Sequence, residues 1–98
     1  PDTEDFYAQK DEAVLKLKKA VTILEKGQPV LNNEISRCHR NLDIIRSDSE
    51  KLILDDAQDH YLSAEQELGK QLRKLIERRK SIYDVLKRAQ LAVGIAER

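Results

Sequence analysis

Apolar residues recur at alternating three- and four-residue steps through the first half of the chain. Only Gln28 interrupts a series formed by Val14, Leu17, Val21, Leu24, Leu31, Ile35, Cys38, Leu42 and Ile45. This spacing brings one apolar side chain per helical turn onto a single face, as at the core positions of a coiled coil. The pattern therefore predicts a helix that packs along another helix, and strand alternation appears nowhere.

The second half of the chain keeps the same helical spacing. Its expected core positions are Ile53, Ala57, Tyr61, Ala64, Leu68, Leu72, Leu75, Ile82, Leu86, Ala89 and Val93. Other apolar residues widen the stripes beyond what two packed helices cover. They are Leu15, Ile23, Val30, Ile44, Leu54, Leu62, Ile76, Val85 and Leu91. A third helix would cover them, so this excess favours a three-helix arrangement.

The only Gly-x-Pro of the chain predicts the first helix boundary. Gly27 suits the left-handed residue that follows a helix, and Pro29 suits the first turn of the next one, where a backbone N–H is not needed. Acidic Glu4 and Asp5 then lie in the first turn and Lys26 in the last, as the helix dipole favours. We expect the first helix to cover about residues 3–26.

The second boundary has two candidate positions. Capping boxes at Asp55-x-x-Gln58 and Ser63-x-x-Gln66 would begin a third helix near residues 55–63, which gives the expected fold: an all-α antiparallel three-helix bundle with coiled-coil-like packing. A capping box at Ser47-x-x-Glu50 would instead give an extended two-armed helical hairpin that turns near residues 47–49, with Gly-Gln-Pro as a kink in its first arm. Residues 1–98 are expected to form a single helical domain, a fragment of a longer protein because the sequence starts at Pro1 without Met.

Composition and charge narrow the class of protein. Charged residues make up 37%, against about 25% in typical domains, and three Gly and two Pro are few, as in long helices. Eighteen basic and eighteen acidic residues cancel, so no overall field attracts nucleic acid. We expect no transmembrane segment, because the apolar runs are far too short. A single cysteine suits a reducing compartment, so a cytoplasmic location is expected.

One local patch of positive charge stands out near the C-terminus. Residues 68–98 hold nine basic and three acidic residues, whereas residues 41–67 hold two basic and eight acidic ones. Blocks of opposite sign favour antiparallel helices that neutralise each other. Lys74, Arg78 and Arg88 lie on one flank of the predicted helix with no acidic residue interleaved on that flank, and they form the candidate surface for an acidic partner or an anionic membrane. In the neighbouring sequence "RRKS", Ser81 resembles a kinase substrate and is a candidate phosphorylation site.

Motifs for catalysis or metal binding are weak. Cys38 and His39, with Asp43 four residues after His39, could place two metal ligands on one helical turn, which is short of the four ligands of a structural zinc site. The acidic run "DDAQDH" lacks the glycine and glutamate of a calcium-binding loop. No phosphate-binding or nucleophile motif occurs. We therefore expect no enzyme activity, no cofactor and no metal.

The function expected from these features is protein–protein interaction. The leading hypothesis is a helical module of a scaffold, cytoskeletal or membrane-traffic adaptor protein, which binds a helical partner or associates with itself. One alternative is a regulatory hairpin that binds a small GTPase or other signalling protein. Another is a peripheral bundle at an anionic membrane surface, bound through its basic residues.

Overall fold

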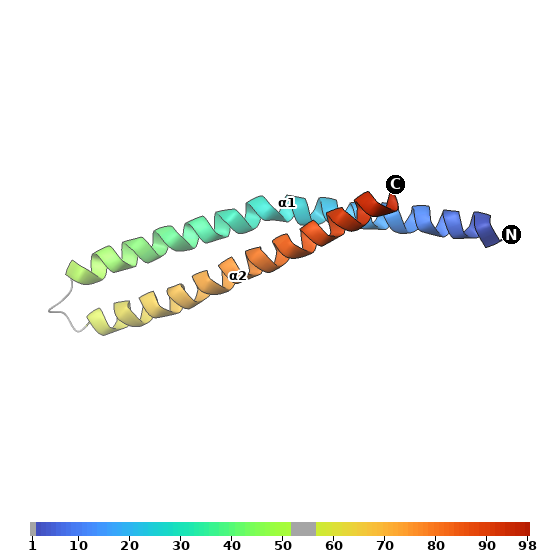
Figure 1. Cartoon of the computed structure of the whole chain (residues 1–98). Helices are drawn as coiled ribbons and strands as arrows, with labels where there is room; N and C mark the ends of the chain where they lie inside the picture. Colours follow the sequence, from blue (N-terminus) through green and yellow to red (C-terminus); the bar gives the residue numbers. More distant parts are fainter. Residues whose placement is uncertain (1, 52–56) are drawn as a thin grey trace. The chain divides into compact units, whose positions relative to one another are not determined.

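The computed structural model describes residues 2–51 and 57–98, without the side chains of residues 2, 49 and 50. Helix α1 covers Asp2–Lys51, and helix α2 covers Gln58–Ala96 (Figure 1). The described stretches contain no strand, so the expected all-helical class is confirmed. The carbonyl of Ala57 accepts the first hydrogen bonds of α2, from the N–H groups of His60 and Tyr61 at 3.1 Å each. The start of α2 falls within the interval predicted for it.

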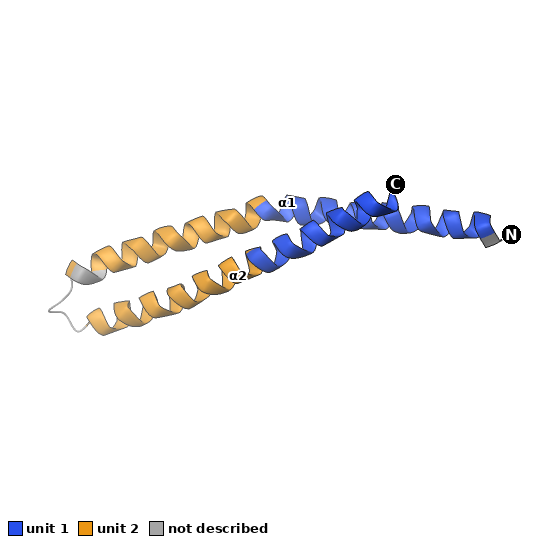
Figure 2. Cartoon of the chain, viewed as in Figure 1, with its two compact units in different colours: residues 1–28, 80–98 blue, residues 29–79 orange. Residues whose placement is uncertain are grey.

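Contacts divide the chain into two compact units (Figure 2). The first unit comprises residues 1–28 and 80–98, and the second comprises residues 29–79. Each unit pairs a segment of α1 with a segment of α2. In the second unit, for example, Asn32 contacts Arg79 and Arg46 contacts Glu65. Rising numbers on α1 meet falling numbers on α2, so the paired segments are antiparallel.

The prediction of three helices was wrong, because no boundary forms at Gly27 and Pro29. Both residues lie inside α1, and neither Gly27 nor any other described glycine has a positive φ, so the left-handed cap is absent. Proline removes one backbone hydrogen bond and costs about 3 kcal/mol in a helix interior. Packing offsets that cost: α1 keeps its three- and four-residue spacing through Gln28, so Leu31 and Ile35 remain buried on the same face.

The alternative prediction of two helical arms is correct in helix number, but its turn near residues 47–49 was misplaced. Residues 47–49 are helical, and α1 continues to Lys51. Ser47 is exposed, and no glycine or proline in this stretch forces the backbone out of the helix. The expected core position Ile53 and the capping box at Asp55 lie outside the described residues.

The core is a narrow line of side chains between paired helix segments. Its buried members are Leu31, Ile35, Cys38, Leu42, Leu72 and Leu86, all at predicted core positions. Half-buried residues continue the line at alternating three- and four-residue steps. On α1 they are Val14, Leu17, Val21, Leu24, Gln28 and Ile45, and on α2 they are Tyr61, Glu65, Leu68, Leu75, Arg79, Ile82, Ala89, Val93 and Ala96.

One predicted core residue was wrong, because Ala64 is exposed and Glu65 occupies the half-buried position beside it. The carboxylate of Glu65 accepts a hydrogen bond from Nε of Arg46 at 2.8 Å. A long acidic side chain can therefore lie at the core line while its charged end meets a partner at the edge. The apolar pattern alone could not identify this position.

Gln28 provides a test of the core line, because its side chain is polar at a core position. Its amide nitrogen Nε2 is buried and has no hydrogen-bond partner among the described residues. A buried unpaired polar group costs about 1 to 3 kcal/mol. Replacing Gln28 with leucine should therefore raise the free energy of unfolding by about 1 kcal/mol or more, as measured by urea denaturation. A loss of stability would contradict the placement of Gln28 in the core.

Candidate protein–protein interface

The polar contacts between paired helices gather on one side of the core line. In the first unit, Lys18 forms an ion pair with Glu97, and Gln90 donates a hydrogen bond to Glu25 at 3.2 Å. Each of these four residues follows a core position by one residue. In a coiled coil such positions lie on one side of the core, and residues that precede a core position by one lie on the other.

The opposite side of the first unit carries mostly apolar residues, interrupted by Lys16 on α1 and by Ser81 and Arg88 on α2. We call this surface the apolar flank: it consists of Ala13, Ala20, Ile23 and Gly27 on α1, and Val85, Ala92 and Ile95 on α2. All seven residues are exposed, and the larger side chains are strongly so: Ile23 is 71% exposed, Val85 51% and Ile95 55%.

The two helices contribute to this flank in the same way. Ala20 and Gly27 precede core positions on α1, and Val85 and Ala92 do so on α2. Because the segments are antiparallel, these equivalent positions lie on the same side of the pair. Ile23 and Ile95 continue the flank outward at three-residue steps. The sequence had identified Ile23 and Val85 as excess apolar residues, but Ile95 was missed, although it continues the spacing of Val85 and Ala92.

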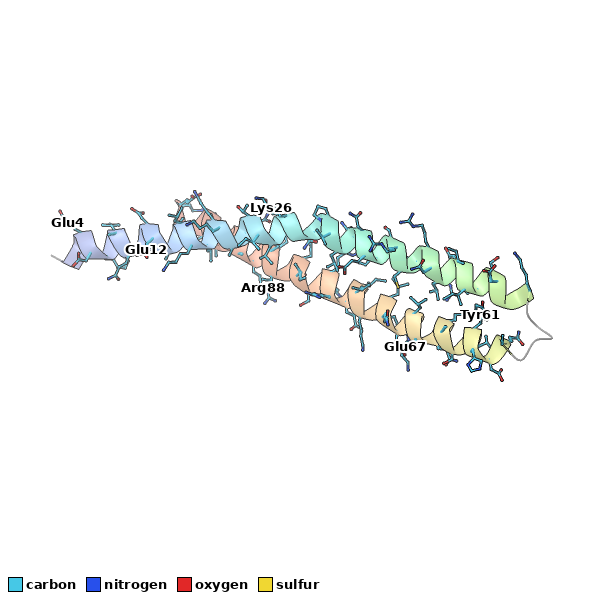
Figure 3. All side chains as sticks on the ribbon, turned by 180° about the vertical axis from the view of Figure 1, so that it is seen from behind. Glu4, Glu12, Lys26, Tyr61, Glu67 and Arg88 are labelled. Carbon is cyan, nitrogen blue, oxygen red and sulfur yellow. The ribbon has the colours of Figure 1, made fainter. Side chains whose placement is uncertain are left out.

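The predicted basic residues are divided between the units. Lys74 and Arg78 belong to the second unit and Arg88 to the first, and all three are exposed. Figure 3 shows Arg88 pointing away from the paired segment of α1. Within residues 2–51 and 57–98, none of the three takes part in an ion pair. Their charges are therefore open to solvent and not neutralised by an acidic stretch of α1.

This exposure gives a stability prediction. Lys74 and Arg78 are like charges four residues apart, which is mildly unfavourable within a helix. Reversing both to glutamate preserves that relation and breaks no ion pair, so the free energy of unfolding should change by less than about 0.5 kcal/mol. Thermal and urea unfolding of the double variant would measure it. A loss of 1 kcal/mol or more would mean that an acidic partner within the chain pairs with these residues.

The candidate metal ligands do not converge. The thiol of Cys38 is buried and contacts the carbonyl oxygen of Leu68 at 3.7 Å, whereas His39 and Asp43 are exposed. The described part of the chain holds no group of three or more His, Cys, Asp or Glu residues arranged to hold a metal ion. Cys38 therefore serves as a small core residue of the second unit.

Hollows border the paired helices among the described residues, and one in each unit is large enough to describe. The larger, of about 710 Å³, lies in the first unit between Tyr7, Val14 and Ala96 and is open to solvent. The smaller, of about 270 Å³, lies in the second unit beside the Arg46–Glu65 ion pair and Gly69. The larger hollow is lined by both charged and apolar side chains, whereas the smaller is lined by charged and polar side chains and one glycine. Their shape is that of shallow grooves between helices.

Ser81 is exposed in the first unit, so its hydroxyl is accessible. It lies four residues before Val85, on the outward continuation of the apolar flank. Phosphorylation there stays a prediction; it would add about two negative charges next to the flank.

Neither helix contains, in its described residues, an apolar stretch long enough to cross a bilayer. Comparison with protein-family models, curated proteins and solved structures finds no match for the chain.

Proposed function

We propose that this chain is a non-enzymatic, cytoplasmic helical module that binds another helical protein segment. Modules of this kind occur in scaffolds, cytoskeletal linkers and membrane-traffic adaptors, an analogy drawn from fold class alone. The observation that carries the proposal is the apolar flank of the first unit. An amphipathic helix normally buries its apolar stripe, and here each paired segment carries a second stripe that the other does not cover.

The chemistry of the flank suits a helix as ligand. Small residues at Ala13, Ala20 and Gly27 let a neighbouring backbone approach closely, and the larger Ile23, Val85 and Ile95 offer anchors on either side. Helical ligands dock through residues at three- and four-residue steps, a spacing that the flank shows from Ala20 through Ile23 to Gly27 and from Ala92 to Ile95. Burying three aliphatic side chains of this size contributes roughly 1.5 to 3 kcal/mol each.

Substitution of these anchors tests the proposal. In the variant Ile23→Ser/Val85→Ser/Ile95→Ser, capture of partner proteins by the tagged chain from cell extract should fall at least tenfold. Its unfolding should change little, because the replaced side chains are exposed. The matched control is Leu15→Ser/Tyr83→Ser/Leu91→Ser, which removes exposed apolar residues outside the flank. Equal capture by both variants and the parent would overturn the proposal.

A further inference from the structure

A row of exposed charges borders the apolar flank on α1. Asp5, Glu12, Lys19 and Lys26 follow one another at seven-residue intervals and are all exposed. Seven residues make almost two helical turns, so the four side chains lie along one side of the helix. Their signs divide the row into an acidic half and a basic half.

A row divided in this way is complementary to itself when two copies lie antiparallel. Asp5 of one copy then lies level with Lys26 of the other, and Glu12 lies level with Lys19. Twofold symmetry repeats both pairs, which gives four ion pairs of opposite charge. In a parallel arrangement like charges would meet at every level, which disfavours that orientation.

The same antiparallel register also brings exposed apolar residues beside the row toward each other. Phe6, Ala13, Ala20 and Gly27 each follow a residue of the row by one, and Ile23 lies between the last two. To within half a helical turn, the antiparallel register that pairs the charges brings Phe6 of one copy to Ile23 of the other. Phe6 is 62% exposed and contacts the ring of Tyr7 edge-on at 5.7 Å between centroids.

The middle of the contact would hold small residues. With the same offset of about half a helical turn, Ala13 of one copy lies near Lys16 of the other, and the small alanine leaves room for the methylene stem of the lysine. The ammonium group of Lys16 already meets Glu12 of its own helix at 3.3 Å, in an exposed pair.

We infer that the apolar flank of the first unit binds a second copy of this chain, through an antiparallel contact between the two α1 helices centred near Ala13 and Lys16. The inference rests on the proposed function, and it names a second copy of the chain as the helical segment that the flank binds. Charge complementarity carries it, because the row pairs two acidic with two basic residues about a single centre and borders exposed apolar side chains.

Sedimentation equilibrium over a range of concentrations tests this contact with two charge-reversed variants. The parent should pass from the monomer mass of 11.3 kDa to twice that mass as concentration rises. Lys19→Glu/Lys26→Glu makes the row wholly acidic, and Asp5→Lys/Glu12→Lys makes it wholly basic. Each variant alone turns four attractive pairs repulsive, so its dissociation constant should rise roughly 100-fold.

An equal mixture of the two variants restores all four opposite-charge pairs and should form a one-to-one dimer about as tightly as the parent. The matched control Arg37→Glu/Arg40→Glu reverses exposed α1 charges outside the contact and should dimerise like the parent. Circular dichroism verifies that every variant is folded.

A parent that stays monomeric, a variant that dimerises alone as tightly as the parent, or a mixture that stays monomeric would each overturn the inference. A monomeric parent whose partner capture is still lost with Ile23→Ser/Val85→Ser/Ile95→Ser would overturn the second copy as occupant and leave the proposed function standing. Capture that is insensitive to those substitutions would remove the proposed function itself.

Discussion

Replacing Leu42 with alanine is expected to lower the free energy of unfolding by about 2 to 3 kcal/mol. Leu42 is the most deeply buried core side chain of the second unit, at 3% exposure. Truncation removes its apolar contacts and leaves a cavity, which costs about 2 to 5 kcal/mol in protein cores. The lower end applies here, because a core between two helix segments is shallow and solvent reaches a cavity from both sides.

The control for Leu42 lies two residues further along the same helix. Ile44 is 58% exposed, and its change to alanine should alter stability by less than about 0.5 kcal/mol. Urea denaturation at a concentration where the chain is monomeric measures both variants. A loss below about 1 kcal/mol for Leu42→Ala would mean that the second unit does not pack as described.

Replacing Pro29 with alanine is expected to stabilise the chain by about 3 kcal/mol. Pro29 is exposed inside α1, where it has no N–H to bond the carbonyl of Glu25. Alanine restores that bond and relieves the clash of the proline ring with the preceding turn. Helix content, read by circular dichroism, should rise or stay unchanged while the urea midpoint rises.

Ser36→Ala is the matched control for Pro29→Ala, because Ser36 is exposed seven residues later in the same helix. It should change stability by only a few tenths of a kcal/mol. If Pro29→Ala destabilised the chain, proline would be terminating a helix at this position, and α1 would not run through it.

The spacing of apolar residues predicted the core of α1 completely, from Val14 to Ile45, because burial on a helix face leaves a direct periodic trace. The continuity of α1 through Pro29 could not be predicted in the same way. Gly27 and Pro29 are local signals whose cost of a few kcal/mol competes with the packing of Leu31 and Ile35, and the sequence does not show which term is larger. The helix continues through Pro29 because this keeps the core residues before and after it on the same face.

The candidate interface was predicted only in part. Ile23 and Val85 were recognised as excess apolar residues, but they were assigned to a third helix within the chain. Whether such residues face solvent depends on how many helices the chain forms. The predicted number was three, because a helix boundary was wrongly expected at Gly27 and Pro29. The row from Asp5 to Lys26 is a seven-residue repeat in the sequence. That its four side chains lie along one side of a single helix follows only from the finding that residues 2–51 form one uninterrupted helix.

A photo-activated crosslinking residue at position 23 tests the central claim most directly, namely that the apolar flank binds another helix. The matched site is position 15, which is also apolar, exposed and on α1, but outside the flank. At a concentration where the parent dimerises, irradiation should crosslink position 23 to the first turns of α1 in a second chain, around Phe6. Position 15 should give little product. Equal yields at both sites, or no crosslink from position 23 to any protein, would contradict the assignment of the flank as a binding surface.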